Sequence, residues 1–333
     1  MDESILYSLR ENFYSYKSDH EKLWKDKNFV IKALKESRFS TMYIDDKLKC
    51  NKEIAILMVK RDPMSLEDLP DFFRNNWKIV LEAVTTYGKS LMFASNRLRD
   101  DKKIVLGAVS NYGYSLKYAS KRLRNNEDIV IVAYENDIYS LEYASISLRN
   151  NKFFMSAAIK FNIYAFTYIS EDLKKDQDFV QNQIEKDARI LKYSPDEYKS
   201  NKNIILKNLD KNYRIMKYIN PELNKDKDFM KNCIQINPES IRFTVINDKE
   251  LAFEALKKDG SLLEYIGEGL VKDRDFMKRV VKFLDDYSYQ FVPKKFRKKR
   301  CFYYDECDCR LHIKQYDEFY NKPRTFIQIM QIL

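Results

Sequence analysis

Glycine and proline are scarce in this sequence, with six and seven residues among 333. Collagen-like chains, low-complexity linkers and turn-rich β architectures all need more of these residues, so the composition excludes those classes. Histidine occurs only twice, at His20 and His312, which leaves few groups for acid–base catalysis near neutral pH. The five cysteines are an odd number without secretory features, which favours reduced thiols in a cytosol-like compartment.

Long apolar runs are also missing. The longest, residues 129–134, is far shorter than the roughly 18 residues that span a bilayer, so we expect no transmembrane segment. The first residues show no basic segment followed by an apolar one, which speaks against a signal peptide. Phosphate-binding, Rossmann, serine-hydrolase and zinc-protease motifs are absent as well. We therefore expect a non-enzymatic protein of the cytoplasm, or one delivered into a host cell without a recognisable N-terminal signal.

What the sequence does contain is an internal repeat of 25 residues. Segments 81–100, 106–125 and 131–150 align at this spacing without a gap. Every unit opens with Asp or Asn, and the eleven opening residues are Asp26, Asn51, Asn76, Asp101, Asn126, Asn151, Asp176, Asn201, Asp226 and, after a three-residue deletion, Asp248 and Asp273. Because such periods are typical of solenoids, the repeat decides the fold prediction.

Each unit predicts two helices when positions are counted from the opening residue as offset 0. Offsets 3, 7 and 8 are apolar or small, which is the spacing of one face of an α-helix, and the opening Asp or Asn suits its N-cap. Glycine or proline at offset 12, as in Gly88 and Gly113, ends this first helix. Serine at offset 14, as in Ser90 and Ser115, suits the cap of a second helix. We expect about eleven and nine residues in the two helices.

Helices this short are marginal alone, and one pair cannot bury its own apolar face, whereas stacked pairs can. The sequence thus predicts an all-α fold, an α-solenoid of about eleven two-helix repeats with atypical ends. Residues 1–25 form its N-terminal helical cap, residues 26–297 the repeat array, and residues 298–333 a C-terminal tail or cap.

The signature SL-x-Y-A-S-x-x-LR-N, clearest over residues 76–150, resembles the tandem-repeat family known as domain of unknown function 4116. The resemblance implies a helical repeat with a recognition or scaffold role, and it supplies no catalytic residue. Because that family occurs in bacteria and protists, intracellular pathogens among them, a bacterial protein that contacts host proteins fits the resemblance.

A row of basic residues recurs at offset 23 in seven consecutive units. Its members are Lys49, Arg74, Arg99, Arg124, Arg149, Lys174 and Lys199. Such a row suits a phosphate backbone or an acidic partner, but a cation at this place also stabilises the C-terminal end of a helix. Residues 1–150 hold 25 basic and 22 acidic side chains, and this near balance favours the helix-end role.

Aromatic residues recur at offset 17, as in Tyr118, Tyr143 and Tyr168. They suit base stacking in RNA, but their apolar neighbours favour core rings whose hydroxyls reach a partner at the rim. Offset 13 falls between the two expected helices and should be exposed, so a peptide or partner helix would bind there first. Its large members are Phe39, Met64, Tyr114, Tyr139 and Tyr164.

The repeat pattern ends before the last 43 residues, which carry ten basic and five acidic side chains. A basic cluster there could bind nucleic acid or anionic lipid, act as a nuclear address in a eukaryotic cell, or be a solvated loop. It consists of Lys294, Lys295, Arg297, Lys298, Lys299 and Arg300. Next come four zinc-type ligands, Cys301, Cys307, Cys309 and His312. Their spacing matches no zinc-finger pattern, so we expect no cofactor and keep zinc as an alternative.

These features favour a non-enzymatic protein–protein interaction module or scaffold with a protein partner. The alternative is a nucleic-acid binder that uses the basic row and the basic cluster, whose affinity should fall steeply with salt.

Overall fold

The computed structural model describes residues 22–36, 38–284, 286–293 and 296, and it confirms the all-α solenoid. Regular elements in these residues are all helices, with a single isolated β-bridge between Ile246 and Ile266. The chain divides into two compact units, residues 1–199 and residues 200–333. Of the predicted N-terminal cap, only residues 22–25 are described, with the short helix η2 (Leu23–Lys25), and residues 298–333 lie outside the described residues.

One long α-helix opens every repeat. Unit 1 contains α2 (Lys27–Glu36), α4 (Lys52–Arg61), α6 (Trp77–Thr86), α8 (Lys102–Asn111), α9 (Glu127–Asn136), α11 (Lys152–Phe161) and α13 (Gln177–Lys186). Unit 2 contains α15 (Lys202–Leu209), α16 (Lys227–Ile236), α17 (Lys249–Lys258) and α19 (Arg274–Val281). The predicted N-caps are confirmed, because the Asp or Asn at offset 0 accepts a backbone N–H at the start of each helix.

The predicted second helix of about nine residues is wrong. In its place, most repeats of unit 1 have a six-residue 3₁₀-helix followed by a short α-helix. The 3₁₀-helices are η3 (Arg38–Tyr43), η4 (Pro63–Asp68), η5 (Gly88–Phe93), η6 (Gly113–Tyr118), η8 (Ile138–Tyr143), η9 (Ile163–Tyr168) and η10 (Ala188–Tyr193). The short α-helices are α3 (Asp46–Lys49), α5 (Asp71–Arg74), α7 (Asn96–Arg99), α10 (Ile146–Arg149), α12 (Glu171–Lys175) and α14 (Asp196–Lys199), and the repeat after Asp101 has η7 (Leu123–Asn125) instead.

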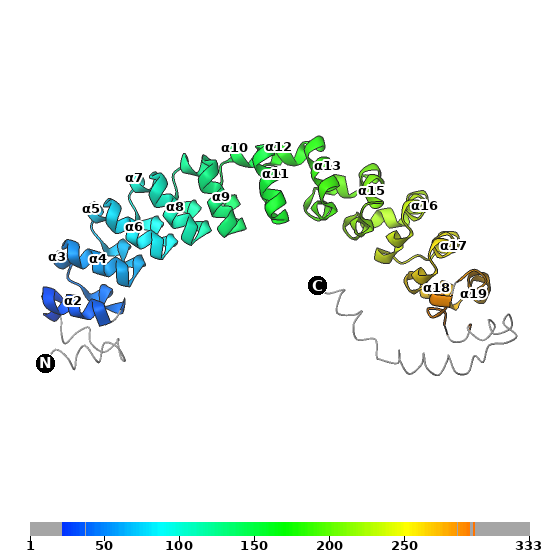
Figure 1. Ribbon diagram of the computed structural model, residues 1–333, viewed down its shortest axis with the longest axis horizontal. Coiled ribbons are helices and arrows are strands. Elements are labelled where there is room, and N and C mark those ends of the chain that lie inside the picture. Colours follow the sequence, from blue (N-terminus) through cyan, green and yellow to red (C-terminus); the bar gives the residue numbers. More distant parts are fainter. Residues whose placement is uncertain (1–21, 37, 285, 294–295, 297–333) are drawn as a thin grey trace. The chain divides into compact units, whose positions relative to one another are not determined.

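Unit 2 follows the same order with more irregular second halves. Its shorter elements are η11 (Tyr213–Tyr218), η12 (Pro221–Lys225), η13 (Pro238–Phe243), η14 (Gly260–Tyr265), α18 (Glu268–Lys272) and α20 (Asp286–Tyr289). In unit 1 the short α-helices form one edge, with the long helices stacked beside them (Figure 1).

A hydrogen bond between repeats explains why the second helix is broken. Ala94, at offset 18, is extended, so the N–H of Ser95 points out of its own repeat and donates to the carbonyl of Arg74 at 2.9 Å. The same bond joins Ser120 to Arg99 and Ser170 to Arg149. Since a buried N–H needs a partner, stacking allows a break that a lone hairpin would not tolerate.

Serine at offset 14 is not a helix cap, which corrects the prediction. Ser90, Ser115 and Ser140 are fully buried within the 3₁₀-helices, and their hydroxyls have no hydrogen-bond partner among the described residues. The position selects a small side chain because the preceding repeat lies against it, and a Cβ on Gly88 would come within 2.9 Å of Ser115 Oγ. The actual caps are residues at offset 11, such as Asp137, for the 3₁₀-helix, and at offset 19, such as Ser145, for the short α-helix.

The family-like signature corresponds to side-chain contacts between neighbouring repeats. Its second serine, at offset 19, donates to the Asn or Asp at offset 24 of the preceding repeat, as Ser95 does to Asn75 at 2.7 Å. In unit 2 the two residue types are exchanged, and the amide of Asn220 donates to the hydroxyl of Ser200 at 3.0 Å. The hydrogen bond between offsets 19 and 24 is therefore kept although serine and asparagine have exchanged places.

Glycine at offset 12 permits close approach of two repeats rather than an unusual backbone conformation, because no described glycine has positive φ. The N–H of Gly88 donates to Asn111 Oδ1 at 2.7 Å, and Gly113 repeats this bond with Asn136. The amide of Asn111 in turn donates to the carbonyl of Thr85 at 3.2 Å. Each asparagine thus joins its own helix to the end of the preceding long helix.

Candidate functional site

The seven basic residues at offset 23 all lie half-buried on the short-helix edge of unit 1. Toward both ends of the row the cation pairs with an acid three residues earlier. Lys49 lies 2.9 Å from Asp46 and Lys174 lies 2.7 Å from Glu171, and Arg74 and Lys199 pair with Asp71 and Asp196 in the same way. A hydrogen bond from each lysine lowers the pKa of Asp46 and of Glu171. These cations are neutralised within their own helix.

The middle of the row has no carboxylate at the corresponding place. Arg99 bonds to Asn96, and Arg149 donates to the carbonyl of Ala144 at 3.2 Å. The Nε atoms of Arg99 and Arg124 are buried without a hydrogen-bond partner among the described residues. The seven cations therefore lie on one edge without forming a continuous free positive stripe.

A second set of ion pairs was missed by the sequence reasoning. Lysines at offset 1 reach the next repeat and bind its offset-0 aspartate, as Lys249 does with Asp273 at 2.7 Å. Lys152 with Asp176 and Lys202 with Asp226 follow the same pattern. The signal in the sequence was the recurrence of lysine directly after the opening residue. These ion pairs connect neighbouring repeats and neutralise the aspartates that open them.

The remaining predicted site residues lie outside the described residues. They comprise the basic cluster Lys294, Lys295, Arg297, Lys298, Lys299 and Arg300, and the zinc candidates Cys301, Cys307, Cys309 and His312. Within the part of the chain that is described, no group of three or more His, Cys, Asp or Glu could hold a metal ion.

Aromatic residues at offsets 13 and 17 meet across neighbouring repeats. The rings of Tyr114 and Tyr143 pack edge to face with centroids 4.8 Å apart, and their hydroxyls are hydrogen-bonded. Two repeats further on, Tyr164 and Tyr193 occupy the same two offsets, and their tilted rings have centroids 5.3 Å apart. Offset 13 lies inside the 3₁₀-helix rather than in a loop, which corrects the prediction. Its expected exposure holds for Tyr139, which is 59% exposed, and for Tyr164, which is 48% exposed, whereas Tyr114 is half-buried.

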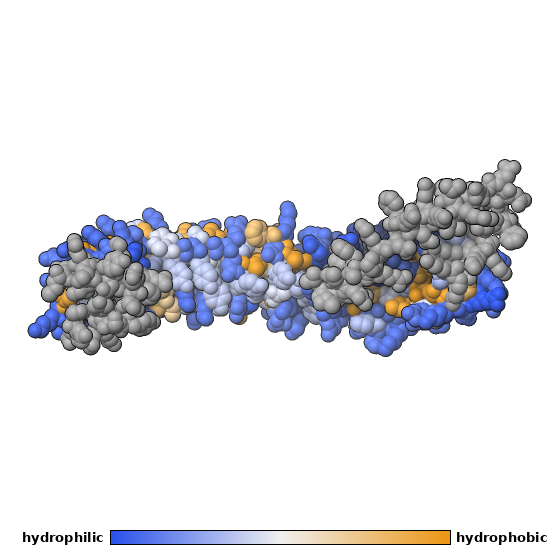
Figure 2. All heavy atoms as spheres, turned by 90° about the horizontal axis from the view of Figure 1, so that it is seen from below, coloured by the Kyte–Doolittle hydropathy of each residue, from blue (hydrophilic) through white to orange (hydrophobic). Residues whose placement is uncertain are grey.

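We call Tyr112, Tyr114, Tyr139, Tyr143, Tyr164, Tyr168 and Tyr193 the tyrosine row. Burial raises the pKa of Tyr143, Tyr168 and Tyr193, so these hydroxyls stay protonated at neutral pH. Lys117 lies over the rings of Tyr114 and Tyr143 at 5.8 and 5.7 Å from their centroids. Figure 2 shows that unit 1 carries a band of residues of intermediate hydropathy, the class to which tyrosine belongs.

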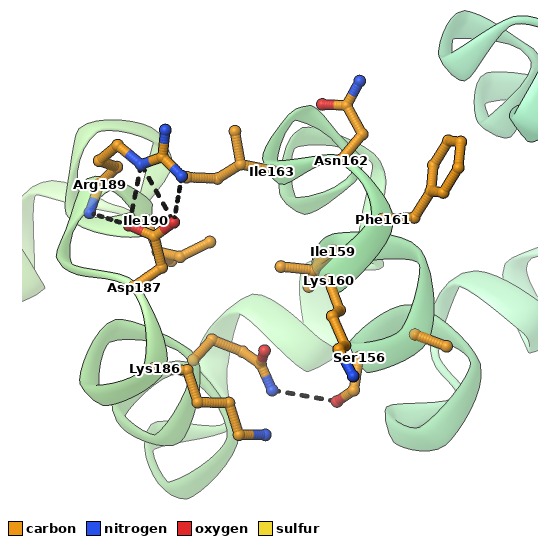
Figure 3. Close-up of a pocket in the computed structure, with 12 residues that line it drawn as sticks. Ser156, Ile159, Lys160, Phe161, Asn162, Ile163, Lys186, Asp187, Arg189 and Ile190 are labelled. Atoms are coloured by element: carbon orange, nitrogen blue, oxygen red, sulfur yellow. Dashed lines mark hydrogen bonds and ion pairs between the residues drawn. The ribbon is translucent and has the colours of Figure 1, made fainter.

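An open groove of about 810 Å³ lies between α11 and α13. Gln183 and Ser156 both line the groove, and Gln183 Nε2 donates a hydrogen bond to Ser156 Oγ at 3.0 Å. Ile159, Ile163 and Ile190 give it apolar walls. In Figure 3, Ile163 and Arg189 converge from the two 3₁₀-helices on one side, while the side chain of Phe161 turns away.

Four charged side chains line this groove. Arg189 binds Asp187 through both carboxylate oxygens, at 2.7 to 3.0 Å. Although burial acts in the opposite direction, these hydrogen bonds lower the pKa of Asp187. Lys160 and Lys186 are exposed and form neither an ion pair nor a hydrogen bond with any described residue. The groove therefore carries two uncompensated positive charges.

Two positions that are small in other repeats hold larger side chains at this groove. Offset 12 holds Ile163 where Gly88 and Gly113 allow close approach, and offset 7 holds the larger Gln183 where most repeats have alanine. Both changes add volume between α11 and α13, so these helices cannot approach as α6 and α8 do. The loss of glycine and alanine in adjacent units was the signal that sequence reasoning did not use.

The family model described as domain of unknown function (DUF4116) matches residues 51–99, 101–149, 151–199, 201–244 and 248–297. Each match spans two of the 25-residue repeats, and together they cover well over half of the chain. No curated protein and no solved structure shows significant similarity to it. Among the described residues, none of the helices has the length and apolar character needed to cross a membrane.

Proposed function

The chain belongs to the DUF4116 family, and from this premise we propose that it is a non-enzymatic interaction module that binds a protein partner along the tyrosine row. The observation that carries the proposal is a pair of ring clusters, one of Tyr112, Tyr114 and Tyr143 and one of Tyr164 and Tyr193, together with the exposure of Tyr139 and Tyr164. Tyrosine combines a large apolar ring with a polar hydroxyl and is enriched at protein interfaces.

The row is suited to binding because most of its rings are already held in place by neighbouring side chains. Tyr114 and Tyr143 support one another, and Lys192 lies 5.2 Å from the centroid of Tyr193. Rigid aromatic side chains lose little conformational entropy on association, so more of their contact energy appears as affinity.

The ion pairs support a protein partner over nucleic acid. A phosphate backbone needs free cations at regular spacing, and four of the seven basic-row residues already have carboxylate partners. If nucleic acid were bound instead, affinity would fall steeply between low and high salt, and the Arg99→Gln/Arg124→Gln variant would lose it.

Site-specific photo-cross-linking tests the proposal. A benzoylphenylalanine at position 139 or 164 should capture a discrete partner from a native lysate, whereas one at Ile146, 68% exposed on α10, should not. Interface hot spots contribute about 2 kcal/mol or more, so Tyr139→Ser/Tyr164→Ser should weaken the captured complex at least about thirtyfold. Equal capture from Ile146, or an unchanged complex with the serine variant, would count against the tyrosine row.

A further inference from the structure

We infer that the groove between α11 and α13 binds an acidic peptide segment that also carries an apolar side chain. The inference rests on the proposed function and narrows it, because it assigns a chemical class to part of the partner. It depends on residues of unit 1 alone.

Charge complementarity points to an acidic ligand. Of the groove's charged side chains, only Asp187 is an acid, and Arg189 neutralises it. Lys160 and Lys186, at the C-terminal ends of α11 and α13, are left to pair with a ligand. A carboxylate between them would gain two charge-assisted hydrogen bonds that the free protein cannot make.

The apolar walls point to a side chain beside that carboxylate. Ile163 is half-buried and would offer apolar surface to a partner's side chain, whereas Ile159 and Ile190 are buried and add little exposed surface. The volume of about 810 Å³ lies in the range of binding pockets, about 300–1,000 Å³. Phosphate or a nucleic-acid backbone would leave these walls unused.

The groove also adjoins the tyrosine row. Ile163 and Tyr164 are the first two residues of η9, and the ring of Tyr164 contacts that of Tyr193 in the next repeat. An extended peptide along the exposed rings would reach the groove without leaving unit 1. This continuity favours a peptide over a small free acid.

The test uses the full chain and a fluorescein-labelled short peptide of alternating leucine and glutamate, followed by fluorescence anisotropy. Two exposed charge contacts of about 0.5 kcal/mol each predict about fivefold weaker binding by Lys160→Gln/Lys186→Gln. The control Lys60→Gln/Lys211→Gln removes exposed lysines from the same two offsets, 9 and 10, in other repeats, and should bind as the wild type does. Equal losses from both double variants would show general attraction to a basic protein and overturn the inference.

Two further arms test the apolar walls and the groove itself. A peptide with serine in place of leucine should bind at least about tenfold more weakly, since burial of one apolar side chain contributes about 1.5–3 kcal/mol. Ile163→Asp, whose fold is checked by circular dichroism, should abolish binding by placing a carboxylate in the groove. An unchanged affinity in either arm would overturn the inference.

The outcome is separable from that of the proposed function. If the lysine variant binds the partner with wild-type affinity while Tyr139→Ser/Tyr164→Ser loses it, the tyrosine row stands and the groove assignment fails. If the peptide binds the groove but no partner cross-links at the row, the groove stands alone.

Discussion

Gly88→Ala should destabilise unit 1 although it adds only one methyl group. The added Cβ would lie well under 3.0 Å from the carbonyl oxygen of Ala108 in α8, and 2.9 Å from Ser115 Oγ. Since the φ of Gly88 is not positive, the substitution causes no backbone strain, and its whole cost comes from these contacts between repeats.

The geometry sets the magnitude. A normal C···O contact is about 3.3 Å, so α8 would have to move away by about 1 Å. That shift would also stretch the bond from the N–H of Gly88 to Asn111, now 2.7 Å. Overpacking of a close contact costs about 1–3 kcal/mol, and we expect a loss in that range.

Urea unfolding followed by far-UV circular dichroism measures the effect, with hydrogen exchange of α8 to localise it because repeat arrays unfold in parts. Gly269→Ala is the matched control, since a Cβ there meets nothing within 4 Å. Alanine is the better helix former, so the control should be neutral or up to about 1 kcal/mol more stable. If Gly88→Ala behaves like the control, the close approach of η5 and α8 does not limit packing.

Two further predictions concern a buried hydroxyl and a titrating cap. Ser140→Ala should raise the free energy of unfolding by about 1 kcal/mol because the Ser140 hydroxyl is buried without a partner among the described residues. Ser65→Ala should lower it by a similar amount, since the Ser65 hydroxyl donates to the carbonyl of Asp62 at 2.6 Å. The urea midpoints of the two variants should therefore shift in opposite directions from that of the wild type. Lys249 and a backbone N–H lower the pKa of Asp273 to about 2, so its contribution is complete above about pH 4 and lost as the pH falls toward 2. Asp273→Asn should flatten that part of the stability–pH curve, and an unchanged slope would contradict the assignment.

Part of the site was predictable from the sequence and part was not. The exposure of Tyr139 and Tyr164 was predicted, although the loop on which that prediction rested is a 3₁₀-helix. The pairing of offset 13 with offset 17 did not, because it depends on the rotation between stacked repeats. The local partners of Lys49 and Lys174 were visible three residues earlier in the chain, but only their geometry shows that the pairs form.

The period, the long helices and their caps could all be predicted from the amino-acid sequence. These features are local: apolar residues at helical spacing define a buried face, and an Asp or Asn satisfies the N–H groups at the start of the same helix. The break in the second helix depends on the stacking of repeats, because the N–H freed at Ser95 finds its acceptor in the preceding repeat. The separation of α11 and α13 by Ile163 and Gln183 likewise depends on stacking, because the distance between two helices depends on the side chains that both bring to the interface.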